Sequence, residues 1–197
     1  MVSQLLTQSS DAVAEQRVLL HGVTWQQYEA LLDTLGDDFP NLRLSYLEGK
    51  LEIMTNSPDH EDLKKMIGMF LEAYLQETQE RFHAGGSTTF RTAAKNRGLE
   101  PDGCYCLGAK KEFPDLAIEV VITSGLVDRL DIYRGLGVKE VWVWQAGQFA
   151  IYHLRSNGYE PIPASELLPK LDIALLASRV QPESQFDAVM AFREAIR

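Results

Sequence analysis

The chain has 197 residues, of which 45% are hydrophobic and 24% charged, and this ordinary composition predicts a folded domain with a buried core rather than a disordered chain. A formal net charge of −9 argues against a general nucleic-acid-binding surface, because such surfaces are normally basic. No apolar run reaches the roughly 18 residues that a membrane-spanning helix needs, so we expect no membrane partner.

The N-terminal residues lack the basic start and the long apolar stretch of a secretory signal, and we therefore expect a cytoplasmic protein. Residues 1–15 are interpreted as a flexible lead-in. Residues 16–197 are interpreted as a single domain, because no linker, repeat or low-complexity tract divides them. Cys104 and Cys106 lack the spacing of a zinc site, so two reduced thiols on a strand are expected.

The hydrophobic pattern predicts helices and strands in mixed order. Residues 24–37 show helical spacing after a capping threonine, Thr24. Two β-type runs then flank Glu48-Gly49-Lys50 and predict a hairpin. Residues 60–80 carry one apolar face and predict a long helix. The remaining elements are expected in this order: strands 87–94, 100–107 and 115–122, helix 126–135, strands 139–144 and 148–154, and helices 172–180 and 184–196.

This order predicts a mixed α/β (α+β) domain with a central sheet. The alternating aromatic residues of the two strands within 139–154 are predicted to pack in a core or an interface rather than to stack on bases. A homodimer through these strands or through the C-terminal helices is a further hypothesis.

Two acids, Asp102 and Glu119, are the most informative residues. Asp102 follows a proline ahead of a predicted strand, and Glu119 lies inside an apolar, β-branched strand. A buried carboxylate needs a cation, a hydrogen-bond donor or a proton. Their separation of 17 residues (119 − 102) suits adjacent strands, which lie about 4.8 Å apart. Two carboxylates at that spacing can share a divalent cation, which can activate water for hydrolysis.

Other interpretations of these acids stay open. Asp102 can be a turn acid after proline, and Glu119 can pair with Arg129 or with a lysine. Asp115 is a rival first acid, because it also follows a proline and would share a strand face with Glu119. Lys110, in the loop between the two acid-bearing strands, and its neighbour Lys111 are either solvated or meet a phosphate.

Several ordered motifs resemble one known family. They are the hairpin 47–54, the helix entry Ser57-Pro58 with His60-Glu61, the triplet Glu100-Pro101-Asp102, the strand 116–121 and the stretch 128–142. Over roughly residues 24–155 the chain resembles the Uma-type family of putative restriction endonucleases, which is abundant in cyanobacteria. That family belongs to the PD-(D/E)xK nuclease superfamily, whose fold is a central mixed sheet flanked by helices.

The resemblance implies a function and a cofactor. Asp102 and Glu119 match the two acids that bind Mg²⁺ in the superfamily, with Mn²⁺ as an alternative, and the implied activity is an endonuclease acting on nucleic acid, most simply DNA. The superfamily lysine two residues after the second acid is replaced by Val121. In the family this lysine moves to the next helix, four residues before the tyrosine that is Tyr133 here, where this chain has Arg129.

Arginine at position 129 leaves two functional interpretations open, an active nuclease and an impaired one. Arginine keeps a positive charge and can stabilise an oxyanion, but it does not lose its proton and cannot act as a general base. A catalytically impaired binding or interaction protein on a nuclease scaffold is therefore the alternative function.

Two more residues are candidates by resemblance. Glu48 is either an exposed turn acid or an accessory acid near the metal. His60 is either a surface residue at a helix start or a pocket residue. A zinc protease is disfavoured, because the residue four after His60 is Lys64 rather than a second histidine.

Overall fold

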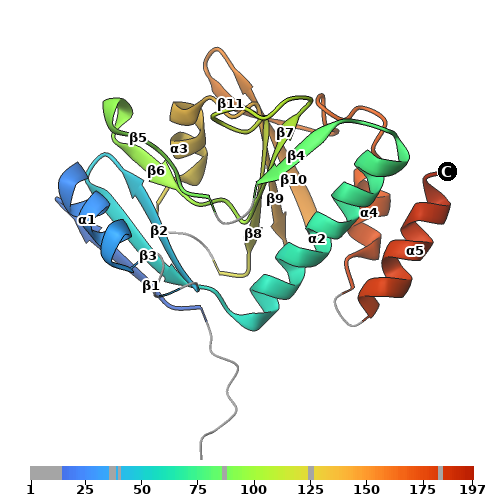
Figure 1. Cartoon of the computed structure of the whole chain (residues 1–197), viewed down its shortest axis with the longest axis horizontal. Helices are drawn as coiled ribbons and strands as arrows, with labels where there is room; N and C mark the ends of the chain where they lie inside the picture. The colour runs from blue at the N-terminus through green and yellow to red at the C-terminus, as the bar shows by residue number, and fades with distance from the viewer. Residues whose placement is uncertain (1–14, 36–38, 40, 86–87, 124–126, 182–183) are drawn as a thin grey trace, which may run out of the picture.

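The computed structural model describes residues 15–35, 39, 41–85, 88–123, 127–181 and 184–197. In Figure 1 two β-sheets stand side by side, with helices on their outer faces and one helix between them. The α-helices are α1 (Trp25–Leu35), α2 (Pro58–Glu77), α3 (Arg129–Leu136), α4 (Ile173–Arg179) and α5 (Gln185–Ala195).

The first sheet is antiparallel and has the strand order β1-β3-β2-β6-β5. A short 3₁₀ turn, η1 (Ala93–Lys95), joins β5 to β6. The predicted hairpin forms β2 and β3. The strands are β1 (Arg17–His21), β2 (Leu42–Leu47), β3 (Lys50–Thr55), β5 (Phe90–Thr92) and β6 (Arg97–Leu99).

The second sheet has the order β11-β10-β9-β8-β7-β4 and is mixed, because β8 and β9 run parallel while the other neighbours are antiparallel. Helix α3 provides the crossover between β8 and β9. The strands are β4 (Phe82–Gly85), β7 (Gly103–Leu107), β8 (Leu116–Val121), β9 (Glu140–Gln145), β10 (Gln148–Arg155) and β11 (Gly158–Ile162).

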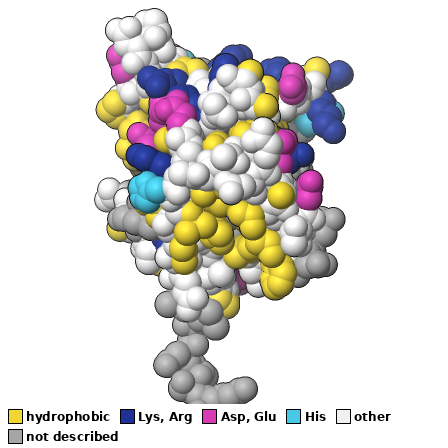
Figure 2. Space-filling model, turned by 90° about the vertical axis from the view of Figure 1, so that its left-hand side faces the viewer, with side chains coloured by type: hydrophobic (Ala, Val, Ile, Leu, Met, Phe, Trp, Pro, Cys, Tyr) yellow, Lys and Arg dark blue, Asp and Glu magenta, His cyan; other side chains and the backbone are white. Residues whose placement is uncertain are grey.

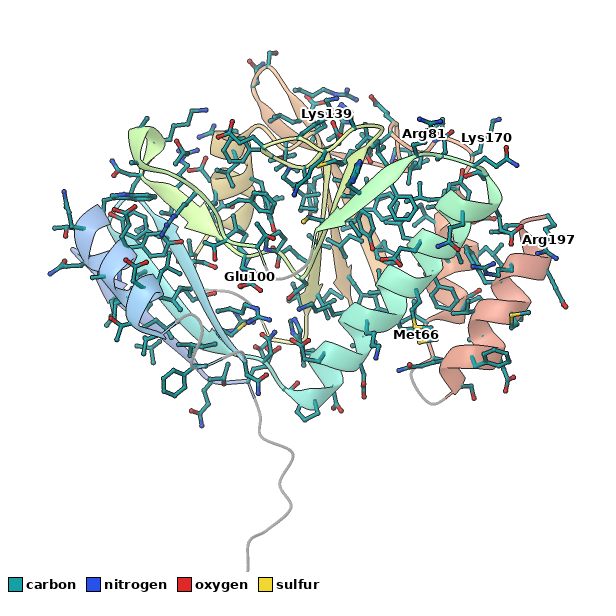
Figure 3. The ribbon with its side chains drawn as sticks, viewed as in Figure 1. Met66, Arg81, Glu100, Lys139, Lys170 and Arg197 are labelled. Carbon is teal, nitrogen blue, oxygen red and sulfur yellow. The ribbon has the colours of Figure 1, made fainter. Side chains whose placement is uncertain are left out.

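Three buried clusters hold these layers together. The first joins α2, α4 and α5 to one face of the second sheet, and it contains Trp142 and Trp144. The aromatic strands therefore pack in the core, as predicted. The second cluster joins α3 to both sheets, and the third joins α1 to the outer face of the first sheet. Met66 on α2, labelled in Figure 3, belongs to the first cluster and is fully buried.

The predicted α+β class with a mixed sheet flanked by helices is confirmed, but the sheet of β1, β2, β3, β5 and β6 was not foreseen as a separate layer. Strands β1, β4, β6 and β11 were also not predicted. The strand expected at 87–94 is shorter, since β5 ends at Thr92, and residues 86–87 lie outside the described residues.

The edge of the first sheet carries exposed hydrophobic side chains. Figure 2 shows hydrophobic side chains gathered on the side of the molecule that includes α1 and β1. Val18 and Leu20 on β1 are 53% and 40% exposed.

In the described part of the chain, no helix has the length and apolarity that crossing a bilayer would require.

Candidate active site

Asp102 and Glu119 lie next to each other where the two sheets meet. The segment between β6 and β7 crosses from the first sheet to the second, and it contains Asp102. Figure 3 shows Glu100 of the same segment between the two sheets. Strands β7 and β8 are antiparallel neighbours with Gly103 opposite Ile118, so Asp102 is level with Glu119. Both acids are buried, at 6% and 2% exposure.

Helix α3 holds the carboxylate of Glu119. Glu119 shares a strand face with Ala117, which packs in the cluster that contains α3. Arg129 and Tyr133 are four residues apart on α3 and project from the same side of that helix. The Arg129 guanidinium donates to one carboxylate oxygen of Glu119, and the Tyr133 hydroxyl donates to the other. The pairing of Glu119 with Arg129, which the sequence left open, is therefore present.

A third buried acid faces the same guanidinium from the first sheet. Glu52 lies on β3 and is 1% exposed. Its Oε1 lies 3.8 Å from an Nη of Arg129 and accepts a hydrogen bond of 3.1 Å from Arg17. Its Oε2 accepts a bond of 3.2 Å from the amide of Val127. Arg129 therefore lies between carboxylates that come from both sheets.

His60 and Glu15 extend the site on the side of Asp102. His60 is in the first turn of α2 and is fully buried, so the surface interpretation is wrong. Its Nε2 lies 2.8 Å from Oδ1 of Asp102, and its Nδ1 lies 2.7 Å from Oε1 of Glu15. The second oxygen of Asp102 accepts a 2.8 Å bond from the amide of Val120 on β8.

Burial and charge shift the pKa values of these groups in different directions. Burial alone would raise the pKa of Asp102, but the hydrogen bond and charge of His60 outweigh it and lower that pKa. Burial raises the pKa of Glu119 and repulsion by Asp102 adds to it, while Arg129 opposes the rise. Burial disfavours a charged His60, yet the carboxylates of Asp102 and Glu15 raise its pKa. These directions favour an ionised Asp102 beside a charged His60, and a Glu119 that holds a proton more readily than a free glutamate does.

Two of the sequence candidates lie elsewhere. Asp115 is buried, but Lys111, Lys139 and the Leu107 amide hold its carboxylate at the start of β8. This clamp stabilises the charged form against the effect of burial, so the pKa of Asp115 is lowered. Lys111 is therefore neither simply solvated nor free to bind a phosphate, because it pairs with Asp115.

Glu48 is an exposed acid at the hairpin turn, where the backbone φ is 47°. Its side chain is 62% exposed and bonds to Arg97 at 2.9 Å, and Arg97 also pairs with Asp131 on α3. Within the described residues, no hydrogen bond or ion pair joins Glu48 to Asp102 or Glu119.

The sequence interpretation missed Glu15, Arg17, Glu52 and the role of Tyr133. Glu52 carries the same signal that identified Glu119, an acid within an apolar strand, and the same argument would have found it. Tyr133 lies four residues after Arg129 on α3, and this helical spacing is the signal that it shares a side of the helix with Arg129. Glu15 and Arg17 have no local signal, because only the fold brings them to His60 and Glu52.

An open cavity of about 640 Å³ adjoins Asp102 and is lined by residues of α2, β4 and β7. Its wall includes Lys64 and Lys65 from α2, together with the acids Glu61 and Glu72, so its charge is mixed. Asp102 is thus close to solvent space even though its own side chain is buried.

A comparison with known protein families shows which family the chain belongs to. The family model Uma2, described as putative restriction endonuclease, matches residues 25–182, which is well over half of the chain. The chain belongs to the Uma2 family. The matched region contains Asp102, Glu119, Arg129 and Tyr133, while Glu15 and Arg17 precede it. A search of curated proteins found no match. Membership of Uma2 confirms the resemblance inferred from the motifs, and it suggests a nuclease.

Proposed function

We propose that the protein is a metal-dependent endonuclease that hydrolyses phosphodiester bonds, with DNA as the first candidate substrate. The observation that carries this proposal is the pair of buried acids, with Asp102 immediately before β7 and Glu119 level with it on β8. Membership of the Uma2 family supports a nuclease independently of that geometry.

Mg²⁺ is the proposed cofactor, with Mn²⁺ as a substitute. Among the residues whose placement is described, no group of three or more His, Cys, Asp or Glu side chains is arranged to hold an ion. The donor chemistry fits nonetheless, because Glu52, Asp102 and Glu119 surround one cationic group, the guanidinium of Arg129. Hard cations prefer such oxygen donors. When bound, Mg²⁺ would supply a water of lowered pKa and polarise a phosphoryl oxygen.

The other residues of the site orient the acids and supply positive charge. The His60 ring lies 2.8 Å from one oxygen of Asp102, and the Val120 amide donates a hydrogen bond to the other. Arg129, at the first position of α3, is the group we propose to stabilise negative charge on the phosphate oxygens. It does not serve as a general base.

The proposed DNA contact is weak and local. The net charge of −9 opposes binding to a polyanion, so affinity has to come from the metal and from a few cations beside the site. Lys64 and Lys65 line the cavity next to Asp102 and are the nearest candidates for phosphate contacts. Such binding is expected to weaken with added salt, with a slope set by the small number of phosphate contacts.

Cleavage of supercoiled DNA tests the function. Purified protein is incubated with the DNA and Mg²⁺, Mn²⁺ or EDTA, and nicked and linear products are quantified on a gel. We expect metal-dependent nicking that Asp102→Asn abolishes. Asp115→Asn is the matched control, because Asp115 is also a buried acid near β8 but pairs with lysines away from the acid pair. Equal cleavage by wild type and Asp102→Asn would contradict the assignment.

The second candidate function is a catalytically impaired binding or interaction protein on the nuclease scaffold. One observation favours it: Arg129 occupies the family lysine position and pairs with Glu119, which gives that carboxylate a cationic partner within the chain. This candidate predicts a well-folded protein that binds Mn²⁺ poorly and cuts no DNA. Recovery of cleavage in Arg129→Lys would identify the arginine as the cause of the impairment.

Homodimerisation stays a prediction. Of the two predicted interfaces, the aromatic strands are occupied by the core, since Trp142 is fully buried. Helix α5 instead exposes Phe186 at 74% and Met190 at 45%, and it is the better candidate surface of the two.

A further inference from the structure

We propose that Glu15 is a positioning residue of the site: it holds His60 in the orientation in which His60 holds Asp102. The inference rests on the proposed function, in which Asp102 is one of the acids that bind the metal. Glu15 lies outside the region matched by the family model, which begins at residue 25.

A continuous chain of contacts connects Glu15 to Asp102. Oε1 of Glu15 lies 2.7 Å from Nδ1 of His60, and Nε2 of the same ring lies 2.8 Å from Oδ1 of Asp102. The three side chains are buried, with exposures of 1%, 0% and 1%. Water therefore does not substitute readily for a missing partner, and removing Glu15 leaves a ring nitrogen of His60 buried without its acceptor.

Glu15 is itself held by one distant residue and by one near neighbour in the chain. Its Oε2 accepts hydrogen bonds from Thr123 at 2.5 Å and from Arg17 at 3.2 Å. Arg17 also donates to the side chain and carbonyl of Thr123, just after β8, and to Glu52 on β3. The segment at the start of β1 thus ties the first sheet to the end of the strand that carries Glu119.

Packing stability alone does not explain why Glu15 and His60 are buried against each other. A buried acid and a buried imidazole cost desolvation free energy, and well-packed apolar side chains usually stabilise a fold as well or better. A histidine whose second nitrogen is fixed by a carboxylate presents its first nitrogen in one orientation and one protonation pattern. Here that nitrogen faces Asp102, so Glu15 determines how Asp102 is presented.

The test observes His60 directly in the full-length chain. The protein is labelled with ¹⁵N-histidine, and the Nε2–H resonance of His60 is assigned with His60→Gln and recorded by NMR. In Glu15→Ala we expect this resonance to shift or to broaden through exchange. In Glu15→Gln, whose amide oxygen still accepts from Nδ1–H, we expect it to stay close to that of the wild type. Melting temperatures are measured in parallel to confirm that each variant folds.

Mn²⁺ affinity provides the second readout, by calorimetry on the same variants. Loss of a group that supports a metal-binding carboxylate typically costs about 10–100-fold in affinity, and we expect a loss of that size in Glu15→Ala with substantial recovery in Glu15→Gln. Glu140→Gln is the matched control, because Glu140 is equally buried and hydrogen-bonded but lies on β9 with Trp142 and Ser165 as partners. It should lower stability and leave Mn²⁺ affinity unchanged.

The outcomes separate this inference from the proposed function. An unchanged Nε2–H resonance in Glu15→Ala overturns the inference whatever the metal does. A changed resonance with unchanged Mn²⁺ affinity also overturns it, and assigns Glu15 a structural role. If the wild type binds no Mn²⁺ and cuts no DNA, the proposed function fails, and the ring resonance alone decides whether Glu15 positions His60.

Discussion

Arg129 compensates the charge of three buried carboxylates from its place at the start of α3. It donates to Glu119, lies 3.8 Å from Glu52 and helps to lower the pKa of Asp102. A buried set of paired charges adds little net free energy of folding. Removing one partner is nevertheless strongly destabilising, because the remaining charges are left uncompensated. The stability of the metal-free protein should therefore depend on this one side chain.

Replacing Arg129 tests this dependence. Arg129→Met should lower the free energy of unfolding in EDTA by about 3 kcal/mol. Mn²⁺ should restore more stability to this variant than it gives to the wild type, since the acids then have no cationic side chain between them. Urea unfolding with EDTA and with Mn²⁺ measures both effects.

The neighbouring Arg134 is the control for that measurement. Arg134→Met removes an arginine from the same helix, but its side chain is 49% exposed and pairs with Asp131 at the surface. Loss of an exposed pair should change stability by less than about 1 kcal/mol. If the two variants lose equal stability, Arg129 does not compensate the buried acids.

Local sequence signals located part of this site. Asp102 follows a proline and Glu119 interrupts an apolar strand, and each signal lies within a few residues of the acid itself. The contact between His60 and Glu15 spans 45 residues. No periodicity or motif encodes such a contact, because it depends on how β1 pairs with β3 and on where α2 begins after β3.

At the scale of elements, Glu140 anchors one loop of the chain to a strand of the second sheet. This fully buried acid on β9 accepts hydrogen bonds from Trp142, Ser165 and the amides of Glu166 and Leu167. It thereby fastens the segment that follows β11 to the second sheet. Burial would raise the pKa of Glu140, but these donors and His153 outweigh it and lower that pKa.

The lowered pKa makes this anchor dependent on pH. A carboxyl group whose pKa is lower in the folded state stabilises the protein above its ordinary value of 4.5, and the stabilisation is lost as the pH falls through the folded-state pKa. Glu140→Gln should cost about 2–3 kcal/mol at pH 7, and the difference from the wild type should shrink below pH 4.5. Urea unfolding between pH 7 and pH 3 measures this difference, and a constant gap would show that Glu140 is not charged in the fold.

Elements with strong local periodicity were predicted, whereas the edge strands β1, β4 and β11 and the short strand β6 were not. Helices α1 and α2 follow apolar faces and capping residues, Thr24 and Ser57, whose side chains accept the expected amide bonds. Strand β11 contains Pro161, which argues against a strand in general, yet β11 is an edge strand where a missing amide donor is tolerated. Strand β4 has only four residues and depends on its pairing with β7.

The whole molecule places the site at the junction of its layers. Acids from the first sheet, from the crossing segment and from the second sheet contact residues in the first turns of α2 and α3. Movement of one sheet against the other would separate Glu52 from Glu119 and Glu15 from Thr123. The site and the packing between the sheets should therefore be lost together on unfolding.

Mn²⁺ binding by wild type and Asp102→Asn, measured by titration calorimetry, tests the central claim that Asp102 and Glu119 form a metal-dependent site. Asp115→Asn serves as the control, since its acid is clamped by Lys111 and Lys139. The metal-dependent nuclease predicts saturable binding to the wild type and to Asp115→Asn, and its loss in Asp102→Asn. Equal binding by all three proteins, or no binding by the folded wild type, would contradict the claim.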